Sequence, residues 1–465
     1  MCRERIVSLP LGSRRVWRAT AVAAAVAALS LLLVAPAPSY DPWMWLLWGR
    51  VVAEGGLDTR DGPAFKPLPV AVCALLAPLG QAAPVVWIFL VRTAALLAVW
   101  LAWRLGRRLA GGSALGGGAA AVGVLLCGRL LGFSASGAEP ALVLAAGLGA
   151  LEAWAAGRER AAVACALACG LLRVEAWPFL LALGALAWRR RPEHRVAVAA
   201  AAVLLPAAWL VPEWVGSGDA LRSGARARVP NPGQAALASF PGAASLREAV
   251  VLPPWPLWIG VAALVPARLR GTSATAARAA LGVAGIGVAW ILVVAAMAQV
   301  GFSGEPRYAL PGAALVAVGG AAGLALAARG PRPLRLLGLS AAVLLAVPIA
   351  VRVVDLPGVR AAQADQWRLG SQLADAVREA GGRKAVLRCG TPYVGRLRGP
   401  LMAYRLQVAK ERVEPDAPPR TPGMVFRSAL TEGAPRTPDA PAAFTPIART
   451  PRWDVLADCG VAASS

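Results

Sequence analysis

The feature that most constrains this chain is a series of long apolar runs separated by short polar gaps. A helix needs about 20 residues to cross a hydrocarbon core of about 30 Å, and most of these runs approach that length. The runs cover residues 17–36, 83–104, 113–131, 139–157, 160–173, 176–189, 196–213, 251–267, 277–299, 309–328 and 333–354. We therefore expect a polytopic α-helical membrane protein with about eleven transmembrane helices.

The composition supports a membrane protein. Of the 465 residues, 57% are hydrophobic and 16% are charged, and the mean hydropathy is +0.58. Soluble domains have about 45–50% apolar and about 25% charged residues. These values exclude a disordered polycation and most classes of soluble enzyme.

The basic excess indicates topology, not nucleic-acid binding. The net charge is +23, and arginines cluster in alternate gaps between the apolar runs. These gaps contain Arg104, Arg107 and Arg108; Arg158 and Arg160; Arg189, Arg190, Arg191 and Arg195; Arg268, Arg270 and Arg278; and Arg329, Arg332 and Arg335. By the positive-inside rule the gaps and the basic N-terminus are cytoplasmic, in a plasma membrane. An odd number of spans then places the C-terminus outside.

The region after the last run differs from the rest of the chain. Residues 355–465 are polar, and we expect them to form a small extracytoplasmic α/β domain behind a membrane domain of residues 1–354. The pattern predicts a helix over 363–380, ended by two glycines, and strands over 384–389, 424–428 and 453–458. Cys389 and Cys459 could form a disulfide there, joining the first strand to the last, if this domain faces an oxidising compartment.

The first polar loop, residues 40–68, begins with a tryptophan-rich segment. We interpret this segment as an amphipathic helix in the membrane interface, with Trp43, Trp45 and Trp48 at headgroup level; a sugar-binding platform is the alternative. His194 is the only histidine of the chain, which argues against a zinc site or a His-based catalytic triad.

Several charged residues lie near predicted outer ends of the spans. Ionisable groups near the hydrocarbon core are costly, so they indicate a site. They are Asp41, Lys66, Glu139, Arg173, Glu175, Glu305 and Arg307. Such a mixed cluster could hold an anionic lipid headgroup and deprotonate a hydroxyl.

An acid directly after the first helix, a following juxtamembrane helix and an outward C-terminal domain resemble the GT-C class of integral-membrane glycosyltransferases. The segments Tyr40–Arg50 (YDPWMWLLWGR) and Gly62–Pro69 (GPAFKPLP) resemble uncharacterised members of actinobacterial type. The resemblance implies an inverting enzyme that moves a sugar from a polyprenyl-phosphate carrier to a cell-envelope glycan, with a role in cell-wall biogenesis.

The resemblance also implies roles for individual residues. Asp41 matches the first-loop acid that acts as general base, and the basic residues Lys66, Arg173 and Arg307 would bind the donor phosphate. Members with two adjacent acids differ from this chain, in which Pro42 follows Asp41. The supporting residues are Glu139, Glu175, Glu305 and Tyr308, with Asp58 or Asp61 as a second acid. No cofactor is required by this pattern, although it is compatible with a divalent metal ion.

Structural roles are the alternatives. Asp41 could cap the helix that follows it, and Arg173 with Glu175, like Glu305 with Arg307, could form ion pairs between helix ends. Lys66 could extend its ammonium group to the interface, and Arg92 could pair with an acid or with a lipid phosphate. The rival functions are a transporter or flippase of a lipid-linked precursor and an inactive scaffold. A transporter should show interrupted helices in two related halves, and the sequence shows them only near 160–189.

Overall fold

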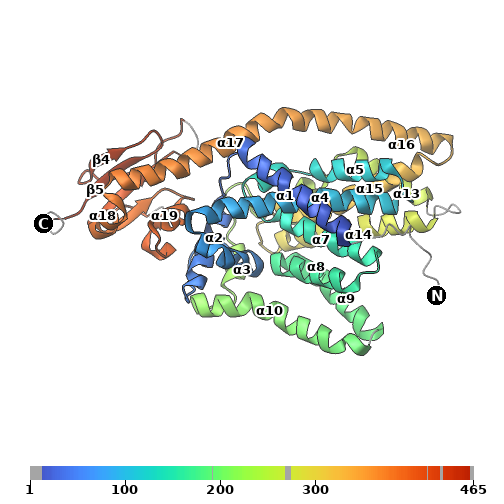
Figure 1. Cartoon of the computed structure of the whole chain (residues 1–465), viewed down its shortest axis with the longest axis horizontal. Coiled ribbons are helices and arrows are strands. Elements are labelled where there is room, and N and C mark those ends of the chain that lie inside the picture. Colours follow the sequence, from blue (N-terminus) through green and yellow to red (C-terminus); the bar gives the residue numbers. More distant parts are fainter. Residues whose placement is uncertain (1–12, 191, 268–273, 416, 430–432, 461–465) are drawn as a thin grey trace.

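The computed structural model describes residues 13–190, 192–267, 274–415, 417–429 and 433–460. It consists of a helical bundle and a smaller tail that contains the sheet, joined by one long helix (Figure 1). The helices of the bundle are α1 (Ser13–Leu33), α2 (Tyr40–Ala53), α3 (Pro67–Leu76), α4 (Ala83–Leu109), α5 (Ala114–Leu125), α6 (Leu130–Ala135), α7 (Pro140–Ala155), α8 (Glu159–Leu172), α9 (Trp177–Arg190), α10 (Arg195–Ser217), α11 (Arg222–Ala227), α12 (Pro241–Val250), α13 (Pro256–Ala267), α14 (Ala274–Gln299), α15 (Pro306–Ala327) and α16 (Arg332–Leu344).

A helix overlaps each of the eleven predicted apolar runs. Among the described residues, six helical segments have the length and hydropathy to cross a membrane, and they are Arg14–Leu33, Pro67–Leu109, Pro192–Ser217, Ala274–Gln299, Pro306–Ala327 and Arg332–Glu379. Helices α5, α7 and α13 are apolar but shorter, at 10–17 residues. Several apolar helices therefore confirm a multi-pass arrangement, and the count of eleven spans stays a prediction.

Helix α15 forms the centre of the bundle. The stretch from Ala309 to Ala327 is buried throughout, and its small residues allow close packing against α13 and α14. A Cβ atom added to Gly260 of α13 would lie 2.0 Å from the carbonyl oxygen of Gly320. Glycine at these two positions therefore lets the two backbones approach without a steric clash.

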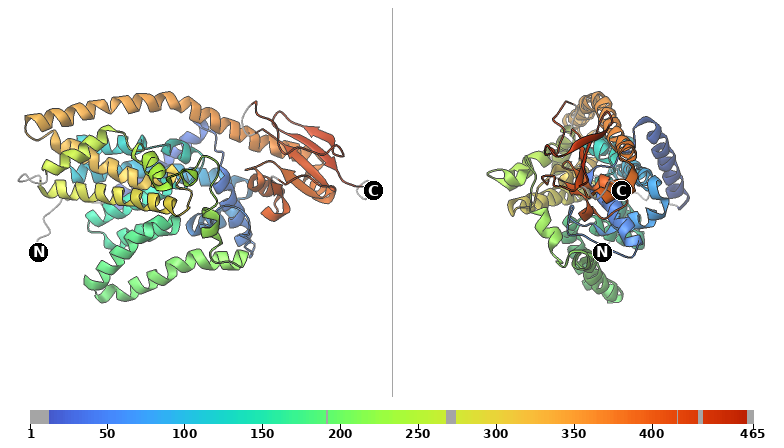
Figure 2. Two further views of the ribbon diagram at one scale, coloured as in Figure 1. Left: turned by 180° about the vertical axis from the view of Figure 1, so that it is seen from behind. Right: turned by 90° about the vertical axis from the view of Figure 1, so that its left-hand side faces the viewer.

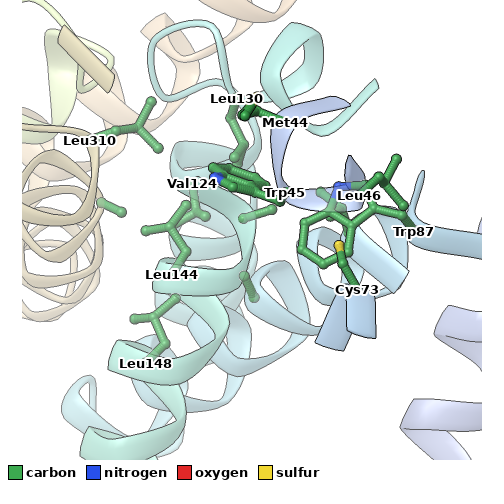
Figure 3. Packing of buried hydrophobic residues seen from close by; sticks show 14 of the residues in the cluster. Met44, Trp45, Leu46, Cys73, Trp87, Val124, Leu130, Leu144, Leu148 and Leu310 are labelled. Atoms are coloured by element: carbon green, nitrogen blue, oxygen red, sulfur yellow. The ribbon is translucent and has the colours of Figure 1, made fainter. Parts of the chain in front are cut away.

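Helix α2 is part of the core. Trp45 and Trp48 are 0% and 1% exposed, and the ring of Trp45 packs edge-to-face on Trp87 of α4 at 5.7 Å (Figure 3). The prediction that these tryptophans form a membrane-interface belt is wrong for both residues. The reason is that α3, α4 and the tail enclose α2, so the indoles bury their area against protein.

The predicted domain boundary, between residues 354 and 355, falls inside a helix. Helix α17 (Ala346–Glu379) runs without interruption from the bundle into the tail. The other tail elements are α18 (Gly382–Cys389), β1 (Thr391–Val394), α19 (Gly399–Leu406), β2 (Glu414–Pro415), β3 (Gly423–Arg427), β4 (Thr445–Arg449) and β5 (Asp454–Asp458). The strands form one mixed sheet in the order β2-β1-β3-β5-β4, with β1 parallel to β2 and β3, and β5 antiparallel to β3 and β4.

The predicted disulfide between Cys389 and Cys459 is present. The predicted strands over 424–428 and 453–458 are confirmed, whereas the strand predicted over 384–389 is wrong because these residues form α18. Val386 and Cys389, one turn apart, are both buried, which is the spacing of a helix face and not of a strand. The disulfide therefore joins a helix end to the residue after the last strand.

The tail docks on the bundle with α19 against α2 (Figure 2). Arg50 donates hydrogen bonds to the carbonyl oxygens of Tyr404 and Val408, at 3.3 and 2.9 Å. The hydroxyl group of Tyr404 donates to the carbonyl oxygen of Gly80 at 2.8 Å. Arg405 donates to Gln81 at 2.7 Å, so polar contacts fix the tail against one end of the bundle.

Candidate functional site

The charged residues predicted to form a site meet at the end of the bundle that faces the tail. Each lies where a helix begins: Asp41 in the first turn of α2, Lys66 before α3, Glu139 before α7, and Glu305 before α15. Arg173 and Glu175 lie in the short break between α8 and α9. The N-termini of helices carry unsatisfied N–H groups and a partial positive charge, so this end of the bundle favours anionic groups.

Glu139 is the centre of the buried part of the cluster. Its side chain is 0% exposed, and the ammonium of Lys66 donates to Oε1 at 2.6 Å. The guanidinium of Arg173 donates to the same oxygen and lies 3.5 Å from Glu175. The second oxygen of Glu139 and that of Glu175 have no hydrogen-bond partner among the described residues. These two buried carboxylate oxygens are therefore unsatisfied within the described part of the chain.

Arg307 organises the part of the cluster that is open to solvent. Its guanidinium lies 2.9 Å from the carboxylate of Asp41 and 2.5 Å from that of Glu305. The side chains of Asp41, Arg307 and Glu305 are 14%, 19% and 24% exposed, so a ligand can reach them. Gln234 donates a hydrogen bond to Glu305 from the loop before α12.

Tyr308 joins the two parts of the cluster. The guanidinium of Arg173 stacks over its ring at 3.9 Å, and that of Arg307 lies 5.2 Å from the ring centre. The ammonium of Lys66 likewise lies 5.2 Å from the ring of Trp45. Aromatic faces help to hold these cations in place and add no negative charge to that of the carboxylates already paired with them.

Asp58 and Asp61 lie outside the cluster. Asp58 forms a hydrogen-bonded ion pair with Arg60, which lowers the pKa of its carboxyl group. Asp61 pairs with Lys410 of the tail, and although burial acts to raise its pKa, the ammonium outweighs burial and the net pKa is lowered. The structure therefore provides no second acid beside Asp41 from this loop.

The sequence analysis did not single out Glu213, which has a positioning role. This carboxylate is 0% exposed and accepts hydrogen bonds from Thr59 at 2.8 Å and from the backbone N–H of Phe65 at 3.3 Å. Arg222 donates to both of its oxygens, at 2.8 and 3.0 Å. Its signal in the sequence is an acid at the end of an apolar run, close to the basic residues of the next loop.

Arg92 has a structural role. Its guanidinium donates to the carbonyl oxygens of Ser30, Val34 and Ala35, at 3.1, 3.0 and 3.3 Å, and to Ala135 at 3.2 Å. These contacts satisfy carbonyl groups at the C-terminal end of α1.

Among the described residues, no three His, Cys, Asp or Glu side chains are grouped in a way that could hold a metal ion.

No protein-family model and no curated protein matches the chain. Two solved structures do, both of ArnT from Cupriavidus metallidurans. The form bound to undecaprenyl phosphate superimposes with a TM-score of 0.51 and 14% identity over 98% of this chain and 99% of that one. The apo form gives a TM-score of 0.50 and 16% identity, over 97% and 99%.

The chain has the fold of ArnT. Because the likeness covers nearly the whole length of both chains, it includes the bundle, α17 and the tail. The expected polytopic helical fold with a small C-terminal domain is thereby confirmed in outline, and so is a multi-pass membrane protein.

Proposed function

We propose that the chain is an integral-membrane glycosyltransferase of the GT-C class, of the actinobacterial type that its sequence resembles. It moves a sugar from a polyprenyl-phosphate carrier to a cell-envelope glycan, with inversion, on the outer face of the plasma membrane. The observation that carries this proposal is the meeting of Asp41 and three cations at one end of the bundle. The fold of ArnT supports it, because that protein is a glycosyltransferase that was solved with bound undecaprenyl phosphate.

The donor phosphate would enter at Arg307. This residue is the most accessible cation of the cluster, and its ion pair with Asp41 is partly open to solvent. A phosphate that binds Arg307 competes with Asp41 for the guanidinium and releases the carboxylate. Lys66 and Arg173 lie behind it and add positive charge from the buried side.

The transfer step follows from these roles. The acceptor hydroxyl attacks the anomeric carbon while the bond from that carbon to the phosphate oxygen breaks. The lipid phosphate leaves with the bonding electrons and is stabilised by Arg307, and Asp41 takes the hydroxyl proton. The described residues supply no group of three metal ligands, so no step is assigned to a metal.

The acceptor would bind between α2 and the tail. A cavity of about 340 Å³ lies there, and ligand pockets generally occupy about 300–1,000 Å³. Its lining includes Tyr40 and Trp43, which flank Asp41 in the first turn of α2, and the exposed Gln366 and Trp367 of α17. None of the lining residues is acidic, and such aromatic and amide groups suit a neutral or acidic saccharide.

The test is transfer of radiolabelled sugar from a panel of polyprenyl-phosphate donors to cell-envelope glycans by the purified chain in nanodiscs. Asp41→Asn should abolish transfer while undecaprenyl phosphate still binds. Asp58→Asn is the matched control, because Asp58 lies in the same loop but pairs with Arg60, and it should leave transfer unchanged.

The rival transporter or flippase predicts a different result. Donor binding without turnover, together with movement of a labelled lipid-linked sugar across liposomes, would support it. The scaffold alternative predicts that Asp41→Asn changes neither donor binding nor any transfer.

A further inference from the structure

A second cavity lies between α1 and α4, beyond the region where the two helices are tied together. Arg92 of α4 fixes the C-terminal end of α1 through hydrogen bonds to the carbonyl oxygen of Ser30 and to those of Val34 and Ala35, which directly follow the helix. Farther along, towards the N-terminus of α1, a cavity of about 520 Å³ lies between the two helices. Figure 1 shows that the N-terminal end of α1 and the C-terminal end of α4 lie away from the tail. The lining of the cavity includes none of the residues of the candidate active site.

The cavity has an apolar part and a basic part. The apolar part is lined by Ala19, Val22, Ala23, Val26 and Leu96. The basic part contains four arginines and two indoles, namely Arg15, Arg18, Arg104, Arg107, Trp100 and Trp103, and none of the lining residues is acidic. The cavity therefore joins a hydrocarbon-like groove to a cationic rim.

The arginines of the rim are not equivalent. Arg104 is neutralised by Glu152 at 2.8 Å. Arg107 donates to the carbonyl oxygen of Gly112 at 3.1 Å and stacks on Trp103 at 5.5 Å, contacts that hold the guanidinium without cancelling its charge. Arg15 and Arg18 are exposed. Three positive charges thus surround one end of the groove with no carboxylate in its lining to balance them.

We propose that this cavity is a binding site for an anionic phospholipid of the cytoplasmic leaflet. One acyl chain fills the groove along Val22, Val26 and Leu96, and the phosphate contacts Arg15, Arg18 and Arg107. The cytoplasmic assignment follows from the arginine clusters of the sequence. Each basic residue near an anionic membrane surface contributes about a fivefold preference for acidic lipid.

Other occupants fit the lining less well. A free phosphate ion would leave the apolar groove empty, and a zwitterionic lipid would leave the three positive charges without a net counter-charge. An apolar helix of a second copy would fill the groove but would place its own surface against the arginines, at a cost in desolvation. The occupant must therefore combine a hydrocarbon chain with a negative headgroup.

The experiment measures which lipid the full-length protein retains. The delipidated protein is offered equal amounts of phosphatidylglycerol and phosphatidylcholine with identical acyl chains, and bound lipid is counted by native mass spectrometry. We expect the wild type to prefer phosphatidylglycerol and Arg15→Gln/Arg18→Gln to lose at least tenfold of that preference. The matched control is Arg332→Gln/Arg335→Gln, which removes two exposed arginines of α16 at the same end of the bundle and should keep the preference.

A further variant tests the groove itself. Val26→Trp leaves every arginine in place but adds an indole to the apolar lining, and it should reduce retention of both lipids. Equal lipid preference in the wild type and in the Arg15/Arg18 double variant would overturn the proposal. So would an equal loss in the Arg332/Arg335 control, because the effect would then be general surface electrostatics, and so would a dimer mass that carries no lipid.

Discussion

Helix α7 has a buried carboxylate at each end, and the two differ in how many of their oxygens have a hydrogen-bond partner. Glu139 and Glu152 are both 0% exposed, and each contacts two cations. Both oxygens of Glu152 accept hydrogen bonds, from Arg104 at 2.9 Å and from Arg108 at 3.0 and 3.2 Å. One oxygen of Glu139 accepts from two donors, and the other has no partner among the described residues.

The two ends of α7 therefore differ in whether both oxygens of the buried carboxylate have hydrogen-bond partners. A buried polar group without a partner costs free energy, so an open acceptor persists in a native structure where something else compensates for it. At the tail end the second oxygen of Glu139 has no partner among the described residues, and partly exposed Asp41 and Arg307 belong to the same group of charges. At the opposite end Arg104 and Arg108 satisfy both oxygens of Glu152, and these bonds hold α4 against α7.

The largest expected effect on stability comes from removing Glu152, the carboxylate with both oxygens hydrogen-bonded. Glu152→Ala leaves Arg104 and Arg108 buried without their carboxylate, and should lower the free energy of unfolding by about 3–5 kcal/mol. The measurement is thermal unfolding in detergent, with Glu379→Ala as the control because Glu379 is exposed at the end of α17. Equal stability of the two variants would contradict the structural role of Glu152.

Removing the charge of Glu139, the carboxylate with one unsatisfied oxygen, should instead affect catalysis. Glu139→Gln removes the charge that orients Lys66 and Arg173, and we expect transfer to fall about a hundredfold, which corresponds to about 2.7 kcal/mol. Stability should fall less than in Glu152→Gln, because Arg173 keeps Glu175 as a partner. If Glu139→Gln unfolds the chain while Glu152→Gln does not, the roles of the two carboxylates are reversed.

Glu213 is a third buried carboxylate, saturated like Glu152 but close to the site. Its bonds to Thr59 and Phe65 position the segment that carries Lys66. Glu213→Gln should weaken this segment and raise the KM for the lipid donor about tenfold, with a smaller change in kcat. A decrease in kcat at unchanged KM would show that Glu213 does not act through donor binding.

The smallest effect is expected at Asp61, which is 51% exposed and pairs with Lys410. Lys410 is only 2% exposed, but asparagine at position 61 would keep an amide oxygen that can accept from its ammonium, so we expect a loss of about 1 kcal/mol. Because the pKa of Asp61 is lowered in the folded state, its contribution is complete above the usual carboxyl pKa and is lost as the pH falls through the lowered value. Asp61→Asn should therefore loosen the tail slightly at pH 7, and the difference from the wild type should shrink as the pH falls through the lowered pKa, as hydrogen exchange of α19 would show.

The periodicity of the sequence predicted where the helices lie but not what packs around them. The apolar runs predicted the positions of the bundle helices because a membrane requires long apolar segments with internally satisfied backbones. The same reasoning placed Trp45 and Trp48 at the interface, because local hydrophobicity is the same whether an indole faces lipid or protein. Helix α18 was predicted as a strand for a similar reason, since eight residues are too few for either period to dominate.

By itself, the sequence determined the multi-pass helical class and the polar tail, because hydropathy is a local property, and it named the cysteine pair that the structure joins. It also marked most members of the cluster, because charges at the ends of apolar runs are rare and costly. Only the tertiary structure decided which charges meet. Asp41 and Arg307 are separated by 266 positions, and their contact exists because α2 and α15 begin at the same end of the bundle. Asp58 and Asp61, much nearer to Asp41 in the chain, turn away to Arg60 and Lys410.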